Sequence, residues 1–307
     1  MDIPVLLMGF NRPDLLTRAL ESLREQGVQN LYVSLDGPRF EDEIGSCEEC
    51  FKCVQQYRDS FQLKVLSRSS NLGCYLGVIS NIDWFFSQVN FGIIIEDDCV
   101  VDEEFFRKAQ EYLDTLELFL GHGVGMITAH NPFEATEGGL ITEYSLIQGW
   151  AIAKETWEKV RPQIFTISWP AIRLNSQRSL WENLYWWSNA TRAKLGGINT
   201  WDGAFSYAMF SHGYKCSIPS RNLISNFGFG LAATHTKDPS GSILIPEVKR
   251  ESLTGSSDSV LRKLYFGVKP HHVFSALIHV LYDFVRFDKR IDFVMKLDKD
   301  NKSRMIS

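Results

Sequence analysis

The sequence predicts an α/β protein in which helices flank a mostly parallel β-sheet. Short aliphatic runs alternate with amphipathic helical stretches through the first hundred residues, as in successive βαβ units. A chain of 307 residues can bury a large core. Its 44% hydrophobic and 22% charged residues are typical of a globular protein and exclude a fibrous or disordered chain.

Four strands are predicted at residues 5–8, 31–35, 63–66 and 93–95, where β-branched or aliphatic residues cluster. Apolar residues recur at helical spacing over residues 15–23 and 78–86, so both segments are predicted to be helices packed on the sheet. Residues 124–153 are predicted to contain two strands with a Gly-rich connection.

A C-terminal helical extension is predicted after Pro270, which suits a helix start. Apolar residues then recur at helical spacing from residue 274 to 285. Seven basic and five acidic residues between 283 and 304 give a balance of +2, which only slightly favours peripheral contact with an anionic membrane. Docking of this helix on the domain itself is the favoured alternative.

Charge and terminal composition exclude several classes. A net charge of -5 argues against a nucleic-acid binder. The N-terminal apolar run is too short for a signal peptide and no apolar stretch is long enough for a membrane span, so we expect a cytoplasmic protein. Cys47, Cys50 and Cys53 have a spacing that zinc or an iron–sulfur cluster could use, but no fourth ligand is evident nearby. We expect reduced thiols there and assign no metal to them.

The four predicted strands are each followed by polar or turn residues. These segments are residues 11–13, 36–38, 69–73 and 96–98. In open α/β sheets, ligands bind outside the carboxyl ends of the strands, so the four segments are expected to share one crevice. Arg68 and Asn71 at the third strand end are candidate nucleotide contacts, although turn formation alone also explains Asn71.

Glu96, Asp97 and Asp98 directly follow a short apolar run that is predicted to be a buried central strand. Adjacent carboxylates repel one another, and a hard divalent cation is the simplest compensation. Extended geometry would place Glu96 and Asp98 on one side and Asp97 on the other. The alternative is a solvated loop that caps the next helix, which explains Asp102 better than it explains the triplet.

Seven of the eight tryptophans lie between residues 150 and 201. They supply either a packed core or flat faces for stacking on sugar rings. The polar, flexible approach to Trp150 predicts that Trp150 and Trp201 border a ligand cleft. Trp181, Trp186 and Trp187, which lie on a helical run, are expected to fill the core.

Residues 93–106, IIIEDDCVVDEEFF, resemble the acidic segment of GT-A glycosyltransferases, particularly the N-acetylglucosaminyltransferase I family and its bacterial, hemolytic protein-like relatives. Further similar segments follow in order: residues 148–157, 199–202, 226–230 and 233–236. The resemblance covers about residues 3 to 236. It implies a GT-A type, Rossmann-like domain over 1–240, with a nucleotide-binding half (1–123) and an acceptor half (124–240), followed by an extension over 241–307.

The resemblance also implies roles for individual residues. Asp98 would ligate Mn²⁺ or Mg²⁺ on the donor diphosphate, Glu96 and Asp97 would contact the ribose or base, and Arg12 and Asp36 would line the nucleotide pocket. Asp202 is the candidate general base, with a helix N-cap as the equal alternative.

His235 lies in Ala-Thr-His-Thr after a Gly-rich turn, where it is a candidate for the metal or the diphosphate. A loop or core histidine that contacts neither is the commoner case.

The predicted function is metal-dependent transfer of a sugar from a nucleotide-diphospho-sugar to a glycan or lipid-linked acceptor. The resemblance favours inversion, bacterial surface-glycan assembly and a location in the cytoplasm, with contact to the inner membrane as an option. The alternatives are a nucleotidyltransferase or pyrophosphorylase on the same sheet, and a non-catalytic nucleotide-sugar-binding protein.

Overall fold

A computed structural model describes residues 2–133, 136, 138–166, 179–228 and 270–285. Its central sheet has the strand order β3-β2-β1-β4-β8-β6-β9-β7. The bounds are β1 Val5–Gly9, β2 Asn30–Leu35, β3 Gln62–Ser67, β4 Phe91–Glu96, β6 Val124–Thr128, β7 Leu140–Thr142, β8 Trp150–Ala153 and β9 Lys215–Ile218. β1 to β4 run parallel, β8 is antiparallel to both β4 and β6, and β9 is parallel to β6. The predicted α/β class with a mostly parallel sheet is confirmed.

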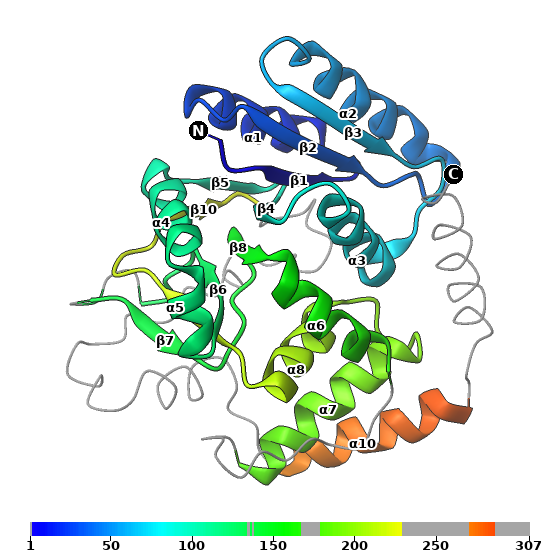
Figure 1. The fold of residues 1–307 in the computed structure, drawn as a ribbon. Coiled ribbons are helices and arrows are strands. Elements are labelled where there is room, and N and C mark those ends of the chain that lie inside the picture. The colour runs from blue at the N-terminus through cyan, green and yellow to red at the C-terminus, as the bar shows by residue number, and fades with distance from the viewer. Residues whose placement is uncertain (1, 134–135, 137, 167–178, 229–269, 286–307) are drawn as a thin grey trace.

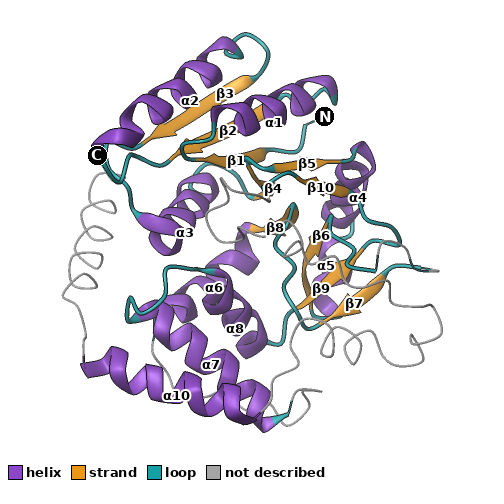
Figure 2. Cartoon of the chain, turned by 180° about the vertical axis from the view of Figure 1, so that it is seen from behind, coloured by secondary structure: helices purple, strands orange, loops and turns teal. Residues whose placement is uncertain are grey.

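Helices cover both faces of the sheet (Figures 1 and 2). One face packs against α1 Pro13–Glu25, α2 Ile44–Gln56 and α4 Glu103–Asp114, and α5 Leu116–Gly121 follows α4. The other face packs against α3 Gly73–Phe86, α6 Lys154–Phe165, α7 Leu180–Lys194 and α8 Asp202–His212. A separate antiparallel ribbon joins β5 Cys99–Val101 to β10 Ile224–Asn226.

Side chains of the central strands alternate between two hydrophobic clusters, one on each face. In β1, Val5 and Leu7 enter the α1-side cluster, whereas Leu6 and Met8 enter the α3-side cluster. This alternation is the period of two that an extended chain imposes. Because both faces are buried, the strands are uniformly apolar, which is why short aliphatic runs predicted them correctly.

All four strands predicted in the first hundred residues are present, as are the two predicted helices. Residues 124–153 differ, because they contribute three strands rather than two. The additional strand, β7, is three residues long and pairs with β9, which lies far away in sequence. A short edge strand formed by a distant partner leaves little local sequence pattern.

The predicted C-terminal helix is α10, Pro270–Val285. It packs on α7 through buried Val273, Ala276 and Val280, and Arg192 Nε lies 3.0 Å from Asp283 Oδ2. The expected docking on the domain is therefore confirmed. Within the described ranges, none of the helices combines the length and apolar character that crossing a bilayer requires.

Candidate functional site

The carboxyl ends of β1, β2 and β4 open into a cavity of about 190 Å³. Their parallel pairing brings the loops that follow these strands to one edge of the sheet. Five of the residues predicted from sequence line the cavity: Arg12, Asp36, Asn71, Glu96 and Asp97. The predicted convergence of strand ends is thus confirmed, and this cavity is the candidate site.

The acidic triplet leaves the sheet in a turn. The Asp97 N–H still donates to the Met8 carbonyl at 2.9 Å, but Asp97 and Asp98 form the turn between β4 and β5. Arg12 bridges the two carboxylates: one guanidinium nitrogen pairs with Asp97, and Nη1 lies 3.1 Å from Asp98 Oδ2. The predicted separation of Asp97 and Asp98 onto opposite sides is therefore wrong, because the chain is not extended there.

Asp97 is only 3% exposed. Its Oδ2 has no hydrogen-bond partner of normal geometry among the described residues, although the Phe10 amide lies near the carboxylate. Burial raises the pKa of Asp97 to about 6, against the opposing influence of Arg12. A buried carboxylate oxygen without a partner at the wall of a cavity is a ready acceptor for a bound ligand.

Glu96 faces the same cavity from the end of β4. Burial, and then the charges of Asp98 and Asp97, raise its pKa to about 8. Cys74 and Asp202 lie close enough to interact electrostatically with it. One guanidinium therefore does not neutralise the triplet.

Asp98 is enclosed by the start and the end of the β5–β10 ribbon. The Cys99 thiol donates to its Oδ1 at 3.2 Å, and the Phe227 N–H donates to its carbonyl at 2.7 Å. Gly228 packs directly on the carboxylate, so that a Cβ there would collide with it. A glycine at this position thus permits the close approach of the ribbon to Asp98.

The donor set fits a divalent cation only in part. Asp97 and Asp98 share a single guanidinium, and Asp97 Oδ2 has no hydrogen-bond partner in the described part of the chain. Among the described residues, however, no three His, Cys, Asp or Glu side chains converge as metal ligands. Mg²⁺ is commonly bound by one or two carboxylates together with substrate phosphates and water, and the turn can supply such a share.

Asp36 and Asn71 tie the β2 loop to the start of α3. Asp36 Oδ1 accepts hydrogen bonds from the Gly37 and Leu72 amides at 3.0 and 3.1 Å. Asn71 Nδ2 donates to the Gly37 carbonyl at 2.9 Å, and its Oδ1 accepts from the Gly73 amide at 2.8 Å. Burial raises the pKa of Asp36 while the Leu72 and Gly37 amides oppose the shift. The turn-forming interpretation of Asn71 is confirmed, and both residues also line the cavity.

Arg68 lies behind the cavity rather than among its lining residues. Its guanidinium donates to Asn81 Oδ1 at 2.5 Å and to Ser80 Oγ at 2.8 Å, both on α3. Asn81 is buried and lines the cavity. Arg68 therefore positions Asn81, and its direct contact with a nucleotide stays a prediction.

Asn199 and Arg39 are among the lining residues that were not predicted as site residues. Asn199 reaches the cavity from the loop between α7 and α8, where its Oδ1 accepts from the Tyr75 amide at 3.2 Å. Arg39 also lines the cavity and pairs with Glu43. Asn199 begins one of the segments that carry the family resemblance, and Arg39 follows Gly37-Pro38, so each had a weak local signal.

Asp202 is the first residue of α8 and is exposed, with the Thr200 hydroxyl donating to its carboxylate. Trp201 occupies the N-cap position, and neither residue makes a side-chain capping bond. The alternative that Asp202 is the N-cap of α8 is therefore wrong, because the N-cap is the preceding residue. Its electrostatic interaction with Glu96 and Cys74 places it near the acidic turn, and its role as a base stays a prediction.

Trp150 and Trp201 do not border the cavity. They are 1% and 2% exposed, their rings stack with centroids 5.9 Å apart, and both pack on Phe205. The expectation that Trp150 and Trp201 face a sugar is therefore wrong. The expectation that Trp181 fills the core is also wrong, since Trp181 is 42% exposed. Trp150 begins β8, a central strand, and α8 covers its face of the sheet. The core interpretation of the tryptophans thus holds for these two residues.

The remaining sequence candidates lie elsewhere. His235 is outside the described residues. Cys47, Cys50 and Cys53 are free thiols on α2, and burial raises the pKa of Cys50 to about 12.

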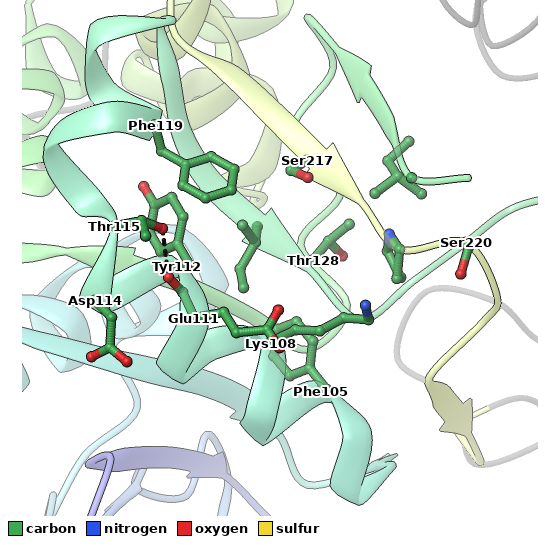
Figure 3. A pocket seen from close by; sticks show the side chains of 14 residues that line it. Phe105, Lys108, Glu111, Tyr112, Asp114, Thr115, Phe119, Thr128, Ser217 and Ser220 are labelled. Carbon is green, nitrogen blue, oxygen red and sulfur yellow. Dashed lines mark hydrogen bonds between the residues drawn. The ribbon is translucent and has the colours of Figure 1, made fainter.

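A second cavity, of about 530 Å³, lies between the α4–α5 segment and strands β6 and β9. Lys108, Glu111 and Asp114 line its helical side, and Ser217 and Ser220 line the opposite side (Figure 3). None of the residues predicted from sequence lies there. The acidic turn and this cavity are therefore separate features.

No protein-family model matches the chain, and no curated protein matches it. Among solved structures, a UDP-glucose pyrophosphorylase complexed with UDP-glucose matches with a TM-score of 0.39 and 8% identity, over 71% of this chain and 90% of that one. HddC from Yersinia pseudotuberculosis matches with a TM-score of 0.31 and 15% identity, over 50% of this chain and 78% of that one. A mannose-1-phosphate geranyltransferase from Thermus thermophilus matches with a TM-score of 0.32 and 12% identity, over 73% of this chain and 76% of that one. None of the three is an N-acetylglucosaminyltransferase, and similarity this low does not assign a function to this chain.

Proposed function

We propose that the chain is an enzyme that binds a nucleotide-diphospho-sugar in the cavity at the carboxyl ends of β1, β2 and β4, and transfers its sugar to an acceptor hydroxyl. The observation that carries the proposal is the acidic turn, in which Asp97 Oδ2 is buried at the cavity wall and has no hydrogen-bond partner of normal geometry among the described residues. Sugar hydroxyls and ribose hydroxyls are the donors that such a carboxylate accepts.

Four of the lining residues, together with Asp98 and Asp202 nearby, then have proposed roles. Asp97 and Glu96 accept hydroxyl hydrogen bonds, and Arg12 and Arg39 offer cationic groups to a diphosphate. Asp98 would hold Mn²⁺ or Mg²⁺, which stabilises the negative charge that develops on a departing diphosphate. In the transfer, the bond from the sugar anomeric carbon to the diphosphate oxygen breaks while the acceptor oxygen bonds to that carbon. Asp202 is the proposed group that takes the acceptor proton.

A second candidate is nucleotidyl transfer, in which a sugar phosphate attacks a nucleoside triphosphate and pyrophosphate leaves. Gly9 at the end of β1 and Arg12 in the loop that follows both line the cavity, and a loop before a helix can cradle phosphates. The names of two of the similar structures, a UDP-glucose pyrophosphorylase and a mannose-1-phosphate geranyltransferase, refer to a nucleotide-sugar and a sugar phosphate. Against it, the segment Gly9-Phe10-Asn11-Arg12-Pro13 has a single glycine.

One screen separates the two reactions. The protein is incubated with UDP-, GDP- and dTDP-sugars and Mn²⁺, and thermal stabilisation and the released nucleotide are measured. Sugar transfer or slow donor hydrolysis releases a nucleoside diphosphate. Nucleotidyl transfer instead consumes a nucleoside triphosphate with a sugar 1-phosphate and releases pyrophosphate.

Asp98→Asn is expected to abolish the reaction by at least roughly a hundredfold, because it removes a negative charge at the proposed cation site. Thermal unfolding of the metal-free variant should stay close to that of wild type, since the change is nearly isosteric. Activity should also vanish in excess EDTA and return with Mn²⁺. Full turnover in EDTA would refute the proposed metal dependence.

A further inference from the structure

Arg12 is the counter-charge of the acidic turn. It pairs with both Asp97 and Asp98, and no other cation within the described ranges pairs with either. Both oxygens of Asp98 are already engaged, since Oδ1 accepts from the Cys99 thiol and Oδ2 accepts from Arg12. Gly228 covers the same carboxylate. A divalent cation that binds Asp98 Oδ2 would therefore compete with Arg12 for this oxygen.

A guanidinium and a divalent cation on one carboxylate repel each other strongly in a partly buried site. Arg12 also lines the cavity, so a diphosphate bound there would offer it new anionic oxygens. We propose that Arg12 is a resident counter-cation that leaves Asp98 for the donor diphosphate when a divalent cation binds. This inference rests on the proposed function and extends it to the order of binding.

Two consequences follow from this exchange. The cation alone binds weakly, because it must displace Arg12 without any compensating partner for the guanidinium. The cation and the nucleoside diphosphate bind synergistically, because each makes the other's site available. Removing the charge of Arg12 should thus strengthen binding of the cation alone and reduce its coupling to the nucleotide.

Mn²⁺ binding is measured by electron paramagnetic resonance of the free ion, with and without UDP or GDP. Arg12→Gln is expected to bind Mn²⁺ alone roughly tenfold more tightly than wild type, with most of the coupling to nucleotide lost. Arg12→Lys keeps the charge but cannot bridge two carboxylates. Its affinity for Mn²⁺ alone should therefore lie between those of wild type and Arg12→Gln. Arg221→Gln is the matched control, since it removes the same charge from ion pairs with Asp102 and Glu104 and is not among the residues that line the cavity. It should leave binding of Mn²⁺ alone near the wild-type value.

The double variant Arg12→Gln, Asp98→Asn should lose the added affinity, which would locate the gained site at Asp98. If circular dichroism shows that Arg12→Gln does not fold, Arg12→Lys carries the test. Equal or weaker Mn²⁺ binding by the folded Arg12 variant overturns the exchange. Donor stabilisation of wild type by nucleotide-sugar and Mn²⁺ reports separately on the proposed function, so the two ideas can fail independently.

Discussion

His130 shows how strongly position in the sheet affects a single titratable residue. It follows β6, which runs parallel to β4, so it lies at the same edge of the sheet as the acidic turn. Burial lowers the pKa of His130 to about 4, although a hydrogen bond with Asn222 opposes the shift. The imidazole is therefore neutral in the folded protein at physiological pH.

Because the pKa of His130 is lower in the folded state than its ordinary value of 6.5, the unfolded chain takes up the proton first. Stability is present above pH 6.5 and is lost as the pH falls toward 4. At pH 5 the expected loss from this group is about 2 kcal/mol. Urea unfolding of wild type and of His130→Gln at pH 7 and at pH 5 measures this loss of the free energy of unfolding. The variant should lose less stability than wild type over that interval, and parallel losses would contradict the assignment.

At the scale of elements, the first turn of α3 joins the two halves of the chain. Backbone amides at the start of this helix donate hydrogen bonds to three side chains. The acceptors are Asp36 from the loop after β2, Asn71 from the loop before α3, and Asn199 from the α7–α8 loop. Tyr75 in the same turn donates through its hydroxyl to the Ile164 carbonyl of α6 at 2.8 Å. The wall of the cavity is thus built from segments that are far apart in sequence.

Asn199→Ala is expected to lower the free energy of unfolding by about 1 kcal/mol, because the Tyr75 amide at the start of α3 loses its acceptor. Nucleotide-sugar binding should weaken as well, since the side chain lines the cavity. Asn199→Asp keeps an acceptor of the same size and should retain most of the stability. Chemical denaturation checks both variants, and equal stability of Ala and wild type would show that the capping bond contributes nothing.

At the scale of the whole molecule, α10 completes the helical layer by packing on α7 (Figure 1). Its buried side chains face α7, whereas Ile278 and Leu281 are more than half exposed. The ion pair between Arg192 and Asp283 adds a polar link at its C-terminal end. Residues 270–285 therefore belong to the domain as a docked helix.

Val280→Asp is expected to destabilise the protein by about 3 kcal/mol, because it buries an unpaired charge between α10 and α7. Limited proteolysis within residues 270–285 should become faster. Ile278→Asp, two residues earlier in α10 and on its exposed side, is the matched control. It should change the free energy of unfolding by less than about 0.5 kcal/mol. Equal behaviour of the two variants would mean that α10 does not dock as described.

The acidic triplet, the strands before it and the crevice at the strand ends could be predicted from the sequence, because buried strands and helix faces carry local periodic patterns. Five of the cavity-lining residues lie in the polar segments that were predicted to follow the strands. Other features depended on contacts between distant segments: the pairing of Arg12 with both aspartates, the short strand β7, and the arrival of Asn199 at α3. The stacking of Trp150 on Trp201 was likewise decided by the helix that covers β8. A sequence pattern reports which side chains prefer burial or an aqueous edge, whereas only the packed tertiary structure decides which of them meet.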